Sequence, residues 1–277
     1  MPERLFGLEA ELALSATRAS TTLPTRTLVG TFDQIARRTL AHLPNGNRMY
    51  LANGGLLYID CGLHPEVATP ECTTPWEAVC HLRAGERLVG RLAGLARIEL
   101  GADSVLVSRS NVDYVAGTTW GCHESYLGRR TIDEYRDWLV PHLASRVVYT
   151  GCGGLDPRSP GIRLSLSPRV SHIDRVVSPD STGNRGIFHT RNESLCKGYS
   201  RIHVLAGDNA CSHRSTWLKV GTTALIVALA EARPASTVRL LEPVHAMKGF
   251  ARNLHHRARV QIGNESAVRM TATEVQR

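Results

Sequence analysis

The 277-residue sequence has no long apolar run, few aromatic residues and no closely spaced cysteine pair. No apolar stretch approaches the roughly 18 residues that cross a membrane, and no basic segment followed by an apolar one marks a secretory signal at the N-terminus. The seven cysteines form no C-x-x-C pair and are odd in number, which argues against a disulfide scaffold or a zinc site. We therefore expect reduced thiols, a cytoplasmic setting and no membrane contact.

Aromatic residues account for only 5% of the chain, although its net charge is +8 and its pI is near 9.4. Nucleic acid is the generic partner of a basic protein, but the sequence contains no helix-turn-helix or RNA-binding signature. We therefore expect acidic partners other than nucleic acid. The hydrophobic content of 42% and the charged content of 21% are ordinary for a soluble enzyme, and the length suffices for one sizeable core.

Two carboxylates stand two residues apart in the apolar opening segment, residues 5–12. If this segment is a strand, Glu9 and Glu11 share one face while the apolar residues take the other. Like charges about 7 Å apart repel unless a cation lies between them. Hard oxygen ligands of this kind suit Mg²⁺, commonly together with a nucleotide phosphate. The alternative is an edge strand with one solvated face.

Two further acidic clusters occur along the chain. In the first, Tyr58 and Asp60 share one predicted strand face, and Glu66 and Glu71 come from a loop bounded by prolines. In the second, alternation places three side chains on one strand face: Cys122, Glu124 and Tyr126. Acidic residues on three separate apolar strands favour a metal-lined sheet over three solvated faces.

Helix and strand signals are mixed along the whole chain. Capping, proline and periodicity signals predict helices over residues 31–43, 74–99, 131–144 and 215–232. Apolar alternation and turn signals, including Asn53-Gly54, predict strands over residues 4–12, 48–52, 56–61, 103–109, 118–127, 162–167, 186–190 and 200–206. This mixture predicts an α+β fold with a curved antiparallel β-sheet packed by helices.

A series of ordered motifs resembles one enzyme family. The motifs are Gly7–Glu11, Asn53–Cys72, Ala84–Arg87, Asn111–Leu127, Thr190-Arg191, Arg201–Val204, Gly207-Asp208 and Ser215–Leu225. They run through nearly the whole chain, which resembles the Pup ligase and Pup deamidase (depupylase) family of prokaryotic pupylation, within the glutamine synthetase-like carboxylate–amine ligases. The resemblance implies a single glutamine synthetase-like domain over residues 1–277. That domain would be incomplete, because family members continue further. A fragment, a partner chain that supplies the missing C-terminal region, and a naturally short protein all remain open.

The resemblance also implies a two-step reaction. ATP with Mg²⁺ phosphorylates the C-terminal glutamate of Pup or a Pup-like protein, and a lysine of a substrate protein then attacks the acyl phosphate. The resulting isopeptide bond directs the substrate to the proteasome. The short connection between Glu11 and Asn53 favours the ligase branch. A Pup deamidase/depupylase and a divergent, non-catalytic protein that binds ATP or Pup are the alternatives.

The resemblance assigns roles to individual residues. Asp60 matches the catalytic aspartate, the base for the substrate lysine, and burial would suit that role by raising its pKa. The metal-ligand candidates are the oxygen donors Glu9, Glu11, Tyr58, Glu66, Glu71 and Glu124. The candidates for contact with ATP are Arg191, Arg201 and His203, the arginines because guanidinium groups suit phosphate oxygens. The alternatives are structural: a carboxylate bonded to a turn for Asp60, a core side chain for His203 and surface ion pairs for the arginines.

Three places depart from the family pattern. Leu56 replaces an arginine two residues before Tyr58, Ser110 replaces an asparagine, and Thr190–Leu195 lacks the family's histidine. Each departure removes a candidate contact with phosphate or substrate. Activity of this chain is therefore a separate question from its family resemblance.

Overall fold

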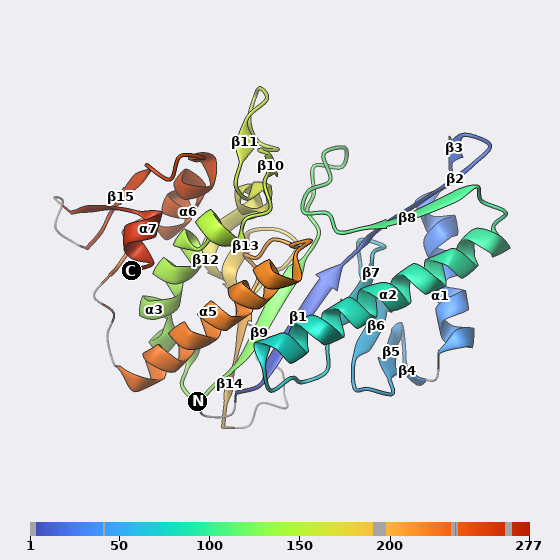
Figure 1. The fold of residues 1–277 in the computed structure, drawn as a ribbon, viewed down its shortest axis with the longest axis horizontal. Helices are drawn as coiled ribbons and strands as arrows, with labels where there is room; N and C mark the ends of the chain where they lie inside the picture. The colour runs from blue at the N-terminus through green and yellow to red at the C-terminus, as the bar shows by residue number, and fades with distance from the viewer. Residues whose placement is uncertain (1–3, 41, 191–197, 234–235, 237, 264–267) are drawn as a thin grey trace. The chain divides into compact units, whose positions relative to one another are not determined.

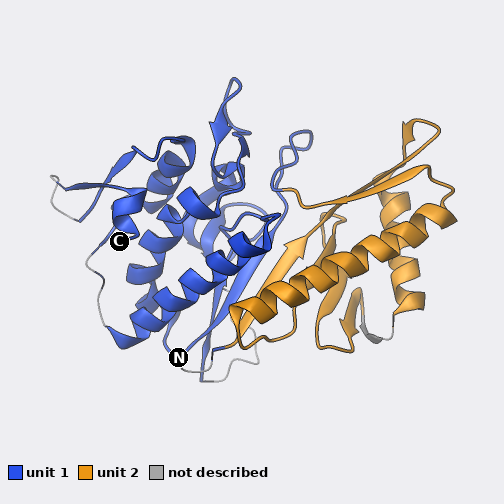
Figure 2. Cartoon of the chain, viewed as in Figure 1, with its two compact units in different colours: residues 1–4, 111–277 blue, residues 5–110 orange. Residues whose placement is uncertain are grey.

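The computed structural model describes residues 4–40, 42–190, 198–233, 236, 238–263 and 268–277, without the side chains of residues 42–45. The chain divides into two compact units (Figure 2): unit 1 comprises residues 1–4 and 111–277, and unit 2 comprises residues 5–110. Each unit contains strands and helices of its own (Figure 1). Within the described ranges, no helix is both long and apolar enough to cross a membrane.

Unit 2 contains an antiparallel sheet formed mainly by hairpins. Its strand order is β1 (Phe6–Glu11), β7 (Pro65–Ala68), β6 (Leu56–Ile59), β5 (Arg48–Leu51) and β4 (His42–Asn45). A smaller sheet consists of β3 (Thr21–Thr22), β2 (Ala13–Arg18) and β8 (Ser104–Ser108). The predicted turn between β5 and β6 is confirmed, because Gly54 has a φ of 85° and its amide donates to the Leu51 carbonyl at 2.9 Å.

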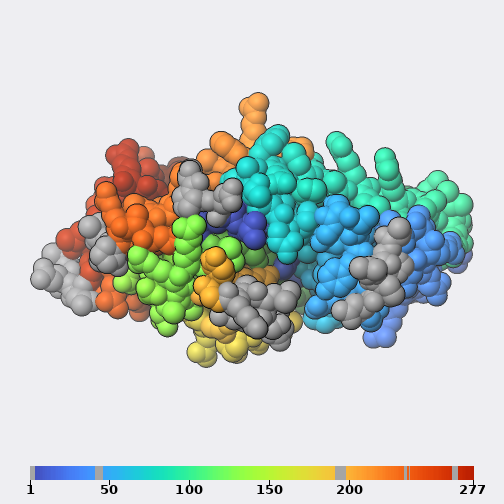
Figure 3. All heavy atoms as spheres, turned by 90° about the horizontal axis from the view of Figure 1, so that it is seen from below, coloured from blue at the N-terminus to red at the C-terminus, as the bar shows by residue number. Residues whose placement is uncertain are grey.

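Helix α2 (Pro75–Glu99) packs on one face of this sheet. It begins as predicted, because the Thr74 hydroxyl accepts a hydrogen bond from the Glu77 amide at 3.1 Å and Pro75 holds the first helical position. Its Gly85 lies so close to Val67 of β7 that an added Cβ would be 3.2 Å from that side chain. Since neighbouring strand residues point to opposite faces, Glu66 points away from α2. Part of α2 is at the surface, in turquoise in Figure 3.

Helix α1 (Thr25–Thr39) differs from the predicted helix over residues 31–43. It begins six residues earlier, after Pro24, because buried Leu28 and Val29 extend the apolar stripe towards the N-terminus. The capping-box signal that predicted this start, Thr31–Gln34, lies inside the helix, where Asp33 forms an ion pair with Arg37 at 2.8 Å. The predicted start was therefore wrong, and the helix also ends earlier because the chain becomes extended at residue 40.

Unit 1 contains a second set of paired strands. Its order is β9 (Cys122–Gly128), β14 (Ser200–Val204), β13 (Arg185–His189) and β12 (Ile173–Ser178). The pairs are antiparallel except for β12 with β13, which is parallel. Strand β9 begins later than the predicted residue 118, because Thr118 bridges back to Asp113 within a loop. Two short hairpins pair β10 (Gly154–Leu155) with β11 (Leu164–Ser165) and β15 (Arg259–Gln261) with β16 (Arg269–Thr271).

The helices of unit 1 pack around α3 (Ile132–Ser145), which contacts α5 (His213–Ala232) and α6 (Pro243–Arg252). The predicted capping box at Thr131 and Glu134 is confirmed. Shorter elements are α4 (Val147–Thr150), α7 (Ala272–Val275) and the 3₁₀ helix η1 (Pro168–His172). The α+β class, with mostly antiparallel strands packed by helices, is confirmed. The single functional domain over residues 1–277 stays a prediction.

Candidate functional site

Strand β1 presents two carboxylates on one face. Phe6, Leu8 and Ala10 are buried, whereas Glu9 and Glu11 are half-buried at the alternate positions. This alternation is the one predicted from the sequence. The two carboxylates therefore point to the same side of the sheet in unit 2.

The register of the neighbouring strands extends this face. Glu11 lies opposite Glu66 of β7, and Glu66 lies opposite Tyr58 of β6. Side chains directly opposite in antiparallel strands have Cβ atoms about 4.5–5.5 Å apart. We call Glu9, Glu11, Tyr58 and Glu66 the acidic row. The prediction that Glu66 comes from a loop was wrong, because residues 65–68 pair with both β1 and β6 and thus form a strand.

Electrostatic interactions within the acidic row disfavour negative charge. Burial, followed by the charges of Glu9 and Glu11, raises the pKa of Glu66 well above its usual range. Burial, followed by the charges of Glu66, Glu9 and Glu11, also raises the pKa of the Tyr58 hydroxyl. A divalent cation would replace this repulsion with attraction. The donors are hard oxygen atoms, so the residues present fit Mg²⁺.

Asp60 directly follows β6 and lies beside the acidic row. Its Oδ1 accepts a hydrogen bond from the His64 amide at 2.7 Å, and its Oδ2 lies 3.2 Å from His64 Nδ1. The same Nδ1 is 3.4 Å from Glu11 Oε2. Burial lowers the pKa of His64, but hydrogen bonds with Asp60 and Glu11 outweigh it and raise the pKa to about 9. Asp60 is therefore hydrogen-bonded within a turn and also lies close to Glu11. The turn contact agrees with the structural interpretation, and the position beside Glu11 agrees with the catalytic one.

Glu71 lies apart from the acidic row. It is exposed in the loop between β7 and α2. Among the described residues, ligand atoms within 4.8 Å of one another include those of Glu11, Asp60 and His64, and Glu71 belongs to no such group. The geometry thus gives no support to the metal-ligand prediction for Glu71.

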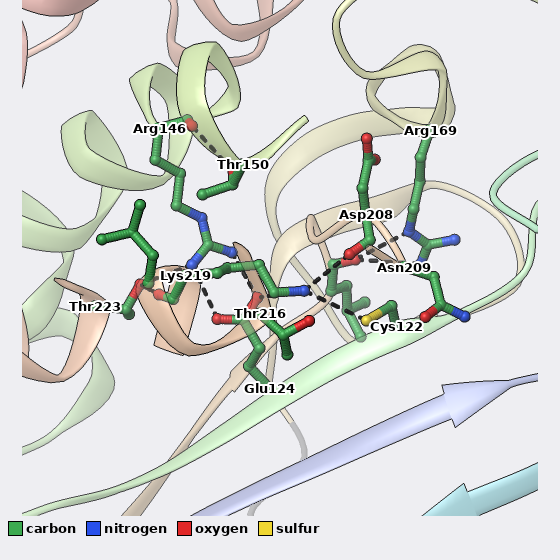
Figure 4. A network of polar contacts seen from close by, with 12 residues as sticks. Cys122, Glu124, Arg146, Thr150, Arg169, Asp208, Asn209, Thr216, Lys219 and Thr223 are labelled. Carbon is green, nitrogen blue, oxygen red and sulfur yellow. Dashed lines mark hydrogen bonds and ion pairs between the residues drawn. The ribbon is translucent and has the colours of Figure 1, made fainter. Parts of the chain in front are cut away.

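Glu124 of β9 lies in a buried network of charges in unit 1 (Figure 4). Arg146 donates to its two carboxylate oxygens at 2.6 and 2.9 Å, the Tyr126 hydroxyl donates at 2.6 Å, and Lys219 Nζ is 3.7 Å away. Burial alone would raise the pKa of Glu124, but Arg146 and Lys219 outweigh it and lower the pKa to about 2. The shared face of Cys122, Glu124 and Tyr126 is confirmed. This geometry favours an ion pair, and the metal-ligand role of Glu124 stays an untested prediction.

The predicted contacts with ATP are only partly described. His203 of β14 is buried, and its ring centroid lies 5.3 Å from the ring centroids of both His189 and His123. Arg201 Nε donates to a serine hydroxyl of β9 at 3.0 Å. Arg191 lies outside the described residues. The proposed roles of Arg191, Arg201 and His203 therefore stay predictions.

The chain matches known proteins over almost its whole length. A family model described as "Pup-ligase protein" matches residues 4–277. The chain belongs to the Pup-ligase family. Pup–protein ligases of Acidimicrobium ferrooxidans and Jonesia denitrificans are each 33% identical to it over 288 aligned residues, which cover 100% of this chain and 61% of each relative. The chain thus spans about three fifths of the length of these Pup ligases.

Two solved structures of Pup ligases share this fold. The complex between the prokaryotic ubiquitin-like protein Pup and its ligase PafA matches with a TM-score of 0.84 at 26% identity, over 99% of this chain and 56% of that chain. The Pup ligase PafA in complex with ADP matches with a TM-score of 0.74 at 29% identity, over 88% of this chain and 55% of that chain. The predicted family resemblance is confirmed.

Sequence reasoning missed two residues beside the acidic row of this Pup-ligase family member. His64 follows Asp60 by four residues in a turn-forming segment, and that spacing could have indicated a contact. Arg48 lies opposite Tyr58 in the β5–β6 hairpin. Its position could have been found from the Asn53-Gly54 turn, because the turn fixes which residues of the two strands face one another.

Proposed function

We propose that the acidic row binds Mg·ATP and that the protein acts in ligating Pup, or a Pup-like protein, to lysines of substrate proteins. The proposal rests on the alignment of Glu11, Glu66 and Tyr58 on adjacent strands. Burial and mutual repulsion disfavour negative charge there, and a bound cation would compensate for it. Family membership supports the same conclusion, because related ligases were solved with Pup and with ADP.

The acidic row would hold the metal through Glu9, Glu11, Glu66 and the Tyr58 oxygen. Mg²⁺ bound there would screen the negative charge of the ATP phosphates while the phosphoryl group moves to the side-chain carboxylate of the C-terminal glutamate of Pup. The protein's own contribution is to fix these oxygen atoms on three paired strands rather than on loops.

Asp60 would act as the base in the second step. Its Oδ2 would accept a proton from the ammonium group of the substrate lysine. The neutral amine would then attack the acyl carbon and displace inorganic phosphate, which leaves the isopeptide bond. The His64 amide and ring hold the Asp60 carboxylate beside Glu11, at the end of the acidic row. A positioned general base contributes about 10²–10⁴-fold to a rate.

Isothermal titration tests the metal role. Glu9→Ala should bind Mg·ATP much more weakly than the wild type, because one of the charges that attract the metal is lost. Unchanged affinity in a folded variant would remove Glu9 from the site. The matched control is Glu99→Ala in α2, which removes an equal charge from a surface pair with Arg38 and should leave the affinity unchanged.

A conjugation assay tests the reaction. Mg·ATP, a Pup-like protein that ends in glutamate and a lysine-bearing protein are incubated with the protein, with and without the additional region of a longer relative. Asp60→Asn should bind Mg·ATP almost normally yet conjugate at least about 100-fold more slowly. A variant that retains more than about a tenth of the activity would show that Asp60 is structural. Cleavage of conjugates without ligation would favour the deamidase/depupylase branch, and nucleotide binding without either reaction would favour a non-catalytic homologue.

A further inference from the structure

An arginine extends the line of side chains formed by the acidic row. Arg48 of β5 lies directly opposite Tyr58 of β6, which lies opposite Glu66 of β7, which in turn lies opposite Glu11 of β1. Residues directly opposite in antiparallel strands point to the same face of a sheet. The Arg48 side chain therefore lies on the face that carries the carboxylates.

The Arg48 side chain lies over the Tyr58 ring. The guanidinium carbon is 5.8 Å from the ring centroid, a cation–π arrangement. A guanidinium group carries its N–H donors along its edge, so one that lies over an aromatic ring can still bind an oxyanion. Arg48 is exposed, and within the described part of the chain no carboxylate forms an ion pair with it.

The backbone on both sides of Arg48 is held in register. The Asn47 side chain donates a hydrogen bond to the Ile59 carbonyl at 3.2 Å, which ties the start of β5 to the end of β6. At the other end of the hairpin, the Leu51 amide donates to the Gly55 carbonyl at 2.8 Å. The guanidinium is therefore carried by a strand whose position relative to Tyr58 is fixed.

We propose that Arg48 contacts the phosphate groups of the nucleotide bound at the acidic row. The proposal rests on the proposed function, because metal held by Glu66 and Tyr58 would bring phosphate oxygens to the neighbourhood of Arg48. Position 56, on the same strand face as Tyr58, is leucine and offers no charge to phosphate. Arg48 supplies a guanidinium group from the adjacent strand instead. Its fork of N–H donors matches phosphate oxygens, which a lysine ammonium would do less specifically.

The test compares nucleotide affinities of a charge-removing variant that keeps the packing on Tyr58. Arg48→Met retains a long apolar side chain over the ring but has no charge. It should bind Mg·ATP about 10- to 100-fold more weakly than the wild type, the range expected for a lost charge-assisted hydrogen bond. Adenosine affinity, measured in the same titration series, should not change. The Mg·ATP affinity of Arg48→Lys should lie between those of the wild type and Arg48→Met, because lysine keeps the charge but lacks the forked N–H donors.

Two further variants make the result specific. Arg26→Met removes an equal charge from the exposed side of α1 and should bind Mg·ATP as the wild type does. Leu56→Arg, added to Arg48→Met, should restore at least part of the lost affinity. Position 56 lies on β6, next to the strand of Arg48, and its side chain is on the same face as that of Tyr58.

The outcomes separate this proposal from the proposed function. If Glu9→Ala loses Mg·ATP binding and Arg48→Met does not, the metal site stands and the role of Arg48 is overturned. Equal losses of ATP and adenosine affinity in Arg48→Met would also overturn it, since they would show a structural role through Tyr58. A folded wild type that binds no Mg·ATP would overturn both proposals.

Discussion

The two units hold their buried carboxylates in opposite ways. In unit 1, Glu124 is bound by Arg146 and lies near Lys219, and its pKa is lowered to about 2. In unit 2, Glu66 is 5% exposed and lies beside Glu9 and Glu11, and its pKa is raised well above its usual range. The same chemical group is thus stabilised as an anion in one unit and destabilised as an anion in the other.

This difference separates a structural network from a candidate binding site. A buried ion pair that is fully hydrogen-bonded needs nothing from outside the protein. Like charges gathered on one strand face lower the stability of the fold unless a ligand compensates for them. The comparison therefore supports unit 2 as the place of the proposed metal site, whereas Glu124 pairs β9 with Arg146 at the α3–α4 junction.

The largest effect is expected from breaking the network of unit 1. Glu124→Gln would leave the Arg146 and Lys219 charges buried without a carboxylate, which costs about 3–5 kcal/mol of unfolding free energy. Urea denaturation measures this loss. The double variant Glu124→Met/Arg146→Met should recover part of it, because both charges of the pair are then absent. A loss below about 1 kcal/mol in Glu124→Gln would match an exposed pair and contradict the buried ion pair.

Local signals in the sequence were sufficient for much of the fold. The alternation of β1, the Asn53-Gly54 turn and the caps at Thr74 and Thr131 depend on residues within a few positions of one another, and the structure confirms each. The start of α1 was mispredicted because a good capping sequence at Thr31 lies inside a longer apolar stripe, and tertiary burial decides between the two.

The sequence predicted only those parts of the candidate site that do not depend on which strands pair. In the sequence, Glu66 is predicted in a loop and Glu124 on a strand, and neither has a neighbour that marks it as a metal ligand or as half of an ion pair. What distinguishes them is their partners: Glu11 lies across a strand pair from Glu66, and Arg146 reaches Glu124 from the end of a helix. Neither partner is near in the sequence, so no local pattern could assign one carboxylate to a metal and the other to an ion pair.

The pH dependence of the unfolding free energy tests a second buried group of unit 1. His142 of α3 lies 3.0 Å from Thr223 Oγ1 and 3.2 Å from Gln276 Oε1. Burial, followed by the charge of Arg146, lowers its pKa from 6.5 to about 3. Below pH 6.5 His142 therefore binds a proton in the unfolded chain, whereas in the folded chain it binds one only near pH 3. Stability is complete above pH 6.5 and falls with pH, by up to about 1.4 kcal/mol per pH unit for this group.

Between pH 6.5 and pH 5 this histidine should thus account for about 2 kcal/mol of lost stability. His142→Gln should show a shallower fall in unfolding free energy over that interval, measured by denaturation at a series of pH values. His172, whose pKa is lowered to about 4 chiefly by burial, contributes in the same direction and remains in the variant. His255→Gln, at an exposed position, is the control and should follow the wild type. Equal slopes for His142→Gln and the wild type would show that His142 is protonated in the folded state.

The smallest expected change, about 1 kcal/mol, concerns the acidic row and has the opposite sign. Glu66→Gln keeps the shape of the side chain and removes a carboxyl group that ionises readily in the unfolded chain but not in the folded one. The metal-free protein should therefore become more stable by roughly that amount. Mg²⁺ should stabilise the wild type by binding only the folded chain, and the variant should lose most of this response.

Glu71→Gln changes an exposed carboxylate outside the row and should alter neither quantity. If Glu66→Gln is instead less stable without metal, Glu66 has a stabilising partner as Glu124 does, and the contrast between the units fails. If Glu71→Gln loses the Mg²⁺ response as well, Glu71 reaches the metal, and the acidic row extends beyond the paired strands.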